Sequence, residues 1–198
     1  MDVAVSSTRQ VGLGEETYAR HLPGSGVGAV AHYLLDRREH ERRQLAELGS
    51  LDDLAALDAM LELPEEADIS RESVSGRVQR IVARLPESAV SQSEDRLRRL
   101  ARHPVRVERI TVAVRRSWTA ALQRVLEFSQ FAERVLVCTS SPTHEQVLEA
   151  SYNGVGVALE GDDGNWVLEP DAFVVQQHSA ARWAFAERVY ALHLSCSN

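Results

Sequence analysis

The spacing of apolar residues changes near Pro104, and this change divides the chain into two regions. In residues 1–103, apolar side chains recur at intervals of three and four, the spacing that places them on one face of a helix. We therefore predict a mainly helical region over residues 1–103, with helices expected over residues 27–48, 51–61, 70–84 and 95–102.

Beyond Pro104 the pattern becomes that of alternating strands and helices. β-Branched residues interleaved with charged ones predict a strand over residues 105–115. Further strands are expected over residues 134–138, 155–160 and 166–169, and helices over residues 118–131, 143–152 and 179–194. This order implies right-handed crossovers and a largely parallel sheet, so residues 104–198 are predicted to form an α/β core with a C-terminal helix. The residues expected to be buried together are Val112, Val114, Leu122, Leu126, Val135, Val137, Val155 and Val157.

The basic residues are of one kind: all 22 are arginine, and the chain contains no lysine. This excludes mechanisms that need a lysine amine, such as Schiff-base chemistry or the lysine of a phosphate-binding P-loop. Arginine in place of lysine throughout is also typical of the codon bias of a GC-rich bacterium. The formal net charge is −7, so a basic patch that binds nucleic acid would act against the field of the whole chain.

The sequence predicts a cytoplasmic protein. Its longest apolar runs fall far short of the roughly 20 residues that span a membrane, so we expect no membrane partner. Residues 1–10 contain no basic segment followed by an apolar stretch, so we expect no signal peptide. The spacing of Cys138 and Cys196 fits no zinc site, and in a reducing compartment we expect one buried thiol and one thiol near the chain end.

The segment ITVAVRRSWTAALQRVLEFSQFAERVLVCTSSP, residues 110–142, carries a family resemblance. Its strand runs into a helix with a Trp-x-x-Ala-Leu pattern, FAERVLV introduces the next strand, and NGVGV at residues 153–157 follows as a Gly-x-Gly strand. This order resembles the third strand, following helix and next strand of the PD-(D/E)XK, or restriction-endonuclease-like, superfamily. The resemblance covers about a third of the chain. It implies an α/β fold in which the N-terminal helical region packs on a restriction-endonuclease-like mixed sheet flanked by helices.

The resemblance further implies a metal-binding glutamate and, two positions later, a lysine on the strand that begins at residue 105. Ala113 and Arg115 stand at those positions. An alanine cannot bind Mg²⁺, which needs oxygen ligands. We therefore expect a degenerate member without a cofactor, which serves as a non-catalytic interaction or regulatory module in a bacterial nucleic-acid or defence assembly.

Two alternatives stay open. One is a Mg²⁺-dependent nuclease with a migrated active site, for which the candidate acids are Glu94, Asp95 and Glu108. The other is an unrelated α/β domain that has the same order of elements.

A basic stripe surrounds the start of the expected strand. Its arginines are close in sequence, and arginine is the residue that most often contacts phosphate oxygens. The candidate nucleic-acid contacts are Arg98, Arg99, Arg102, Arg106, Arg115 and Arg116.

In the expected C-terminal helix, apolar residues cover more of the circumference than one buried stripe requires. We therefore predict an interface, in a homodimer or with another protein, formed by Trp183, Phe185, Val189 and Tyr190. The alternative is that the N-terminal helices cover the second side of this helix.

Two further patterns favour ordinary structure over a site. His32, Asp36 and His40 would share one face of a helix, but eight residues rise about 12 Å, so one metal ion cannot reach both histidines. The glycine-rich stretch at residues 24–28 could offer backbone amides to an anion at a helix start, but no strand precedes it, as a dinucleotide site requires. We therefore expect the two histidines and the aspartate to lie on a solvent-exposed helix face, and the glycine-rich stretch to form a loop.

Overall fold

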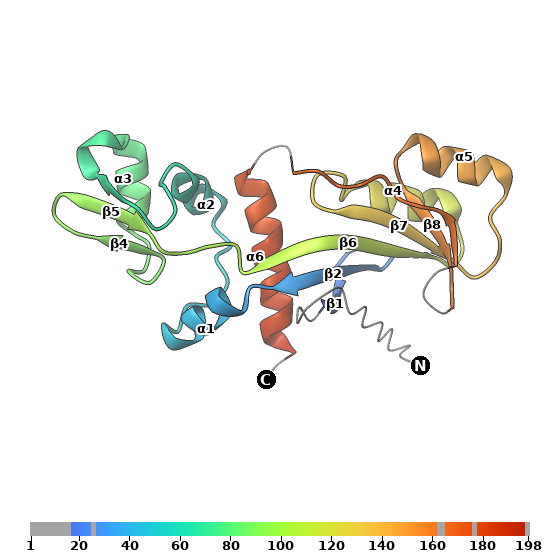
Figure 1. Cartoon of the computed structure of the whole chain (residues 1–198), viewed down its shortest axis with the longest axis horizontal. Helices are drawn as coiled ribbons and strands as arrows, with labels where there is room; N and C mark the ends of the chain where they lie inside the picture. The colour runs from blue at the N-terminus through green and yellow to red at the C-terminus, as the bar shows by residue number, and fades with distance from the viewer. Residues whose placement is uncertain (1–16, 25–26, 162–164, 176–177, 197–198) are drawn as a thin grey trace. The chain divides into compact units, whose positions relative to one another are not determined.

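The structure is a computed structural model that describes residues 17–24, 27–161, 165–175 and 178–196. The chain forms two compact units, each built from two separate stretches (Figure 1). Unit 1 consists of Met1–Leu35 and Val107–Val174, and unit 2 consists of Asp36–Arg106 and Val175–Asn198. The units therefore do not divide at residue 104 as the spacing pattern suggests, because unit 2 includes a long insertion between two strands of unit 1.

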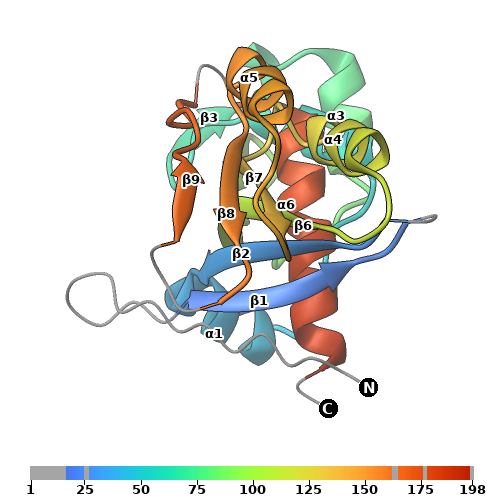
Figure 2. The ribbon, with the colours of Figure 1, turned by 90° about the vertical axis from the view of Figure 1, so that its right-hand side faces the viewer.

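Unit 1 contains a six-stranded mixed sheet in the order β1-β2-β6-β7-β8-β9 (Figure 2). β1 pairs antiparallel with β2, β7 is parallel to β6 and to β8, and β9 returns antiparallel to β8. A mixed α/β architecture is thus confirmed. The strands are β1 Thr17–Leu22, β2 Ala29–Leu35, β6 Val105–Val114, β7 Glu133–Cys138, β8 Gly156–Leu159 and β9 Trp166–Leu168.

The prediction of a helix over residues 27–48 is wrong, because this stretch contains β2 followed by the short helix α1, Arg37–Leu45. Ala29, Ala31 and Tyr33 alternate along β2 and are all fully buried, which is the two-residue period of a strand. Alanine and leucine at neighbouring positions are compatible with the period of a helix and with that of a strand. Their spacing alone therefore does not distinguish a helix from a strand. The backbone amide of Asp36 donates to Pro104 O at 2.9 Å and so joins the end of β2 to the start of β6, which makes these strands antiparallel neighbours.

Two helices connect the parallel strands. α4, Trp118–Leu126, begins at Ser117, whose side chain accepts from the Ala120 amide, and α5, His144–Tyr152, begins with a capping box formed by Thr143 and Gln146. Right-handed crossovers place both helices on the same face of the sheet, where α4 contacts β7 and α5 contacts β8.

The predicted core of this region is confirmed in outline. Of the eight residues expected to be buried together, five are buried and three are half-buried. The buried ones are Val112, Leu122, Val135, Val155 and Val157, and the half-buried ones are Val114, Leu126 and Val137.

Unit 2 combines short helices with a small antiparallel sheet of order β3-β5-β4. Its core contains Leu57, Val78, Val82, Leu97 and Trp183. Its further elements are α2 Leu54–Leu61, β3 Asp68–Ser70, the 3-10 turn η1 Arg71–Ser73, α3 Gly76–Val82, β4 Val90–Gln92, β5 Arg96–Arg99 and α6 Ala180–Ser195.

Two helix predictions in this unit need correction. Residues 95–102 contain strand β5, and residues 70–84 contain the end of β3, η1 and then α3. Three- and four-residue strands carry too few side chains to display a clear period of two. Leu97, buried between exposed Arg96 and Arg98, is the only apolar residue of β5.

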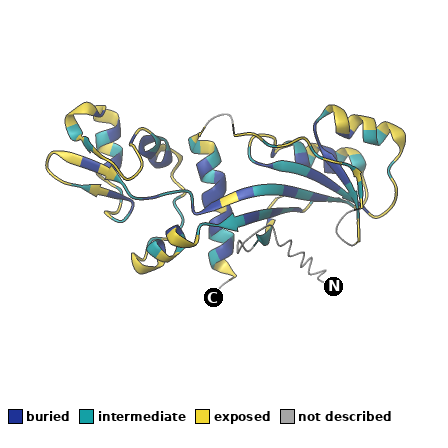
Figure 3. Cartoon of the chain, viewed as in Figure 1, coloured by how far each residue is buried: buried dark blue, intermediate teal, exposed yellow. Residues whose placement is uncertain are grey.

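The interface predicted on the C-terminal helix is wrong. Its four side chains are inside the chain: Trp183 is 0%, Phe185 6%, Val189 0% and Tyr190 1% exposed. α2 contacts α6, and the Tyr190 hydroxyl lies 3.0 Å from Nδ1 of His40 on α1, so helices of the preceding region cover this helix, as the alternative proposed. Figure 3 shows α6 coloured mainly as buried or intermediate. No described helix is long and apolar enough to cross a membrane.

Candidate functional site

The sheet of unit 1 contains the position at which the resemblance places a catalytic acid. Strand register puts Ala113 on β6 beside Val137 on β7, and Val137 beside Ala158 on β8. All three side chains are half-buried and carry no ligand atom, and Arg115 is exposed just after the end of β6. This row therefore presents methyl groups where a two-carboxylate metal site needs oxygen atoms.

A hydrogen-bonded pair joins β2 to β6 on the same side of β6 as Ala113. His32 Nε2 lies 3.1 Å from Thr111 Oγ1. Burial, assisted by the positive charge of Arg109, lowers the pKa of His32 to about 4. The imidazole is therefore neutral at pH 7, and its donor and acceptor roles depend on the tautomer.

Arg109, on the same side of β6, is already engaged. Its Nη2 and Nε donate to the same Glu133 oxygen at 2.9 and 3.3 Å. Its guanidinium also lies 5.2 Å from the ring centre of Trp166. These polar groups are thus hydrogen-bonded to one another and do not form a cluster that is open to a substrate.

The three candidate nuclease acids belong to different units. Glu94 and Asp95 are exposed in the turn between β4 and β5 of unit 2, whereas Glu108 is half-buried on β6 in unit 1. Glu108 precedes Ala113 by an odd number of residues, so the two side chains point to opposite faces of the sheet. Among the described residues, no group of three or more His, Cys, Asp or Glu side chains could hold a metal ion.

The histidine and glycine patterns also take other structures. His32 is on β2, Asp36 is the N-cap of α1 and His40 is within α1, so they do not share one helix face. The glycine-rich stretch precedes strand β2 and not a helix, and its residues 25–26 lie outside the described residues. Both cysteines are free, with Cys138 buried and Cys196 exposed, as predicted.

The six predicted nucleic-acid contacts fall into different environments. Arg99 Nη2 pairs with Glu65 at 3.1 Å, and Arg102 pairs with Glu65 at 2.9 Å and with Glu66. These two arginines hold β5 and the segment after it to the loop that precedes β3. The other four are exposed: Arg98 and Arg106 belong to unit 2, and Arg115 and Arg116 belong to unit 1.

The structure adds a group of arginines that the basic stripe did not include. Arg77, Arg80 and Arg84 are exposed at and just after α3. Their spacing of three and four residues was visible in the sequence and places them along one side of a helix.

The two units differ in charge. Unit 1 has 7 arginines against 13 acidic residues, and unit 2 has 15 arginines against 16 acidic residues. Most of the net charge of −7 is therefore carried by unit 1. A polyanion meets less repulsion at unit 2, where exposed arginines also gather.

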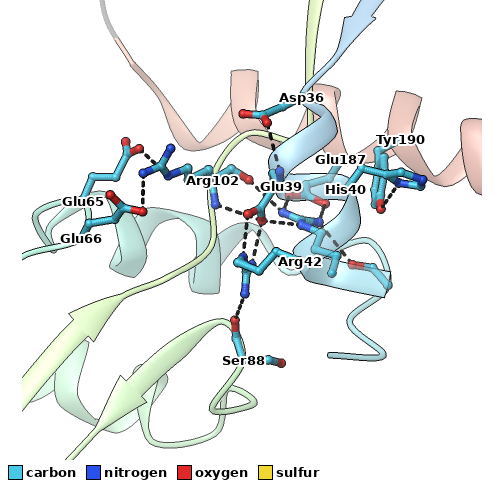
Figure 4. A network of polar contacts seen from close by, with 12 residues as sticks. Asp36, Glu39, His40, Arg42, Glu65, Glu66, Ser88, Arg102, Glu187 and Tyr190 are labelled. Carbon is cyan, nitrogen blue, oxygen red and sulfur yellow. Dashed lines mark hydrogen bonds and ion pairs between the residues drawn. The ribbon is translucent and has the colours of Figure 1, made fainter. Parts of the chain in front are cut away.

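The interior of unit 2 contains a network of buried charges (Figure 4). Arg43 is fully buried, and its Nε donates to Glu39 at 2.7 Å. Its Nη1 and Nη2 donate to the two oxygens of Glu187 at 2.8 and 2.7 Å. The remaining donors reach the carbonyls of Gly49 and Arg102 at 3.2 and 2.9 Å, so all five N–H groups of this guanidinium have partners.

Both carboxylates of this network are saturated with donors. Glu187 also accepts from the Leu51 amide and from Trp183 Nε1, each at 2.9 Å. Burial opposes the ionisation of Glu39, but hydrogen bonds from Arg42 and Arg43 hold the pKa of that carboxyl below its usual value. The network therefore ties α1, α6 and the segment before β6 together and leaves no lone acid or base for catalysis.

A histidine stacks on the same tryptophan. The rings of His103 and Trp183 are 4.8 Å apart and nearly parallel. Burial, together with electrostatic interactions with His178 and with the positive charge of Arg99, lowers the pKa of His103 to about 4. His103 is thus a neutral packing group at pH 7.

No protein-family model, no curated protein and no solved structure matches the chain.

Proposed function

We propose that the chain is a non-catalytic module that binds nucleic acid, built on a nuclease-type sheet and acting within a larger nucleic-acid or defence assembly. The proposal rests on one observation, which is that the two units differ in the charged side chains that they present. The row of side chains at Ala113 lacks carboxylates, while unit 2 exposes arginines on and just after α3 that have either no acidic partner among the described residues or only an exposed one. These are Arg77, Arg80 and Arg84.

The order of strands supports the nuclease-type scaffold. β6 is the third strand of the large sheet in chain order, and it is followed by α4 and by the parallel strand β7. This is the order that the resemblance implies for the strand with the acid-x-lysine motif. Alanine and arginine at residues 113 and 115 then correspond to a scaffold that has kept its packing and lost its metal ligands.

Exposed arginines bind a polyanion through phosphate contacts that release counterions. Each phosphate contact to duplex DNA contributes about −0.9 to the slope of log affinity against log salt concentration. Three such contacts therefore predict a loss of about 40-fold in affinity between 50 and 200 mM salt.

Fluorescence anisotropy of the full chain with labelled 20-base-pair DNA tests this proposal. We expect saturable binding at 50 mM salt that weakens by about the factor given above at 200 mM. Absence of binding at 50 mM, or binding that does not respond to salt, would contradict it. An equally charged polyglutamate competitor serves as the control for non-specific attraction to a polyanion.

A further inference from the structure

Helix α3 presents a mixed surface to solvent. Val78 and Val82 are fully buried in the core of unit 2 and define its inner side. At 100° per residue, Arg80 lies on the opposite side, with the small residues Gly76 and Ala83 near it. Arg77 borders this side within the helix, Arg84 follows the C-cap Ala83, and all five of these outer residues are exposed.

The outer arginines are only weakly engaged. Arg77 pairs with Asp58 at 3.1 Å, but both side chains are at least half exposed, and such pairs contribute little to stability. Arg80 Nε donates to Gly76 O in its own helix at 3.2 Å, and Arg84 has no acidic partner among the described residues. A phosphate can therefore replace these contacts at small cost.

The shape of this helix surface matches a groove. α3 ends at Val82 with its C-cap at Ala83, so Arg77 and Arg80 lie within one turn of the helix and Arg84 lies in the turn that follows it. A Cβ atom at Gly76 would meet nothing within 4 Å, so the backbone there can approach a surface closely. The major groove of B-form DNA, about 12 Å wide, admits a helix, whereas that of A-form RNA is too narrow to be entered.

The other arginine surface of unit 2 is less suited to a polyanion. Arg96 and Arg98 project from the face of the small sheet opposite to Leu97, which is buried with α3. Arg96 lies 3.9 Å from Asp68 and 3.7 Å from Asp95. Arg98 is opposite Asp68 in the strand pairing, so acidic groups accompany both arginines.

We infer that α3 enters the major groove of duplex DNA, with Arg80 directed at the groove and Arg77 and Arg84 at phosphates along its edge. This inference rests on the proposed function and names the surface and the nucleic acid. Arginine suits both positions because its planar fork can bind a guanine edge or a phosphate through two hydrogen bonds.

Two double variants with the same change in charge test the inference in the full chain. Arg80→Gln with Arg84→Gln removes two α3 arginines, and Arg96→Gln with Arg98→Gln removes two from the opposite sheet face. Circular dichroism and thermal unfolding establish that both variants fold. Each variant and the unmodified chain are titrated with duplex DNA, duplex RNA and single-stranded DNA at several salt concentrations.

We expect the α3 variant to lose at least tenfold in affinity for duplex DNA and to reduce the magnitude of the salt slope by about 2. The sheet-face variant should change affinity less than threefold. A loss equal to or larger than that of the α3 variant would overturn the inference and leave the proposed function intact. Tighter binding of RNA or of single strands than of duplex DNA would also overturn it. Failure of the unmodified chain to bind any probe would instead remove the proposed function and the inference together.

A third variant separates charge from geometry. Arg80→Lys keeps the positive charge but replaces the planar fork by a point charge. We expect it to retain the salt slope and to lose discrimination among duplex sequences. Unchanged discrimination would show that Arg80 does not contact base edges.

Discussion

The two units keep their cores together by different means. Unit 1 buries apolar side chains between its sheet and helices, among them Ile110, Val112 and Leu136, each fully buried. Unit 2 has an apolar cluster as well, but it also buries Arg43 at 0%, Glu187 at 1% and Glu39 at 2% exposure. The buried charged side chains of the described chain all belong to unit 2, so polar, directional contacts supplement its apolar core.

This difference affects how each unit responds to substitution. A buried ion pair stabilises a fold little more than well-packed apolar side chains in the same place would. The reason is that the cost of removing the charges from water offsets much of their attraction. Removal of one partner is costly, because it leaves the other charges buried and unpaired. The network of unit 2 should therefore be more sensitive to single changes than its net contribution to stability suggests.

The largest effect is expected for Arg43→Met, which leaves Glu39 and Glu187 without their shared partner. We expect a loss of about 3–5 kcal/mol in the free energy of unfolding, measured by urea denaturation at pH 7.5. The matched control is Arg42→Met, since Arg42 also binds Glu39 but its side chain is 31% exposed. A loss for Arg43→Met no larger than that of the control would contradict a central role for the network.

In unit 1 the corresponding change is Leu136→Ala, which opens a cavity in the middle of the sheet. We expect a loss of about 3 kcal/mol from missing apolar contacts. Because no charge is involved, this loss should be the same at pH 5.5 and pH 7.5, whereas the loss from Arg43→Met should shrink in more acidic solution, where Glu39 without its arginine partner protonates. Equal pH sensitivity of the two variants would remove the distinction between the units.

The same difference explains what the sequence could predict. Each strand from β6 to β9 and each helix between them has its own local pattern, so these elements and most of their core were predicted correctly. In unit 2, Leu97 is the single inward apolar side chain of β5, and arginines surround it. No local pattern can show that Arg43 and Glu187, far apart in sequence, meet in the interior.

The candidate site was predicted in part for the same reason. The absence of a carboxylate at residue 113 follows from residue identity alone and needs no structure. The position of the exposed arginines does not, because Arg99 and Arg102 are bound by Glu65, which is far from them in sequence. The spacing of the arginines on and just after α3 is visible in the sequence, but spacing alone does not distinguish a binding surface from the solvent-exposed side of an ordinary helix.

The pH dependence of stability should have a contribution from one histidine in each unit. His32 in unit 1 and His103 in unit 2 have folded-state pKa values of about 4, below the unfolded value of 6.5. Between these values the unfolded chain binds more protons, so stability is complete above pH 6.5 and decreases as the pH falls toward 4. We expect on the order of 1–3 kcal/mol from each histidine.

Urea unfolding at several pH values between 4.5 and 7.5 measures this contribution. His32→Gln and His103→Gln should each flatten the pH dependence, whatever they do to the stability at pH 7.5. A pH profile that is unchanged in both variants would mean that these histidines titrate normally in the folded chain.

The smallest effects are expected at helix starts, where the two units should be alike. Ser117 caps α4 in unit 1, and Asp53 caps α2 in unit 2 by accepting from Ala55 and Ala56. Replacement of either residue by Ala should reduce the free energy of unfolding by about 1 kcal/mol. A much larger loss at Asp53 would indicate that the sensitivity of unit 2 extends beyond its buried charges.

One measurement addresses the central proposal, that the chain binds nucleic acid without cutting it. The full chain is incubated with end-labelled duplex DNA in the presence of Mg²⁺ or Mn²⁺, and each reaction is resolved on a native and on a denaturing gel. We expect a shifted band on the native gel and intact strands on the denaturing gel with either metal. Metal-dependent cleavage that disappears on Glu108→Ala or Asp95→Ala, or the absence of any shift at low salt, would contradict it.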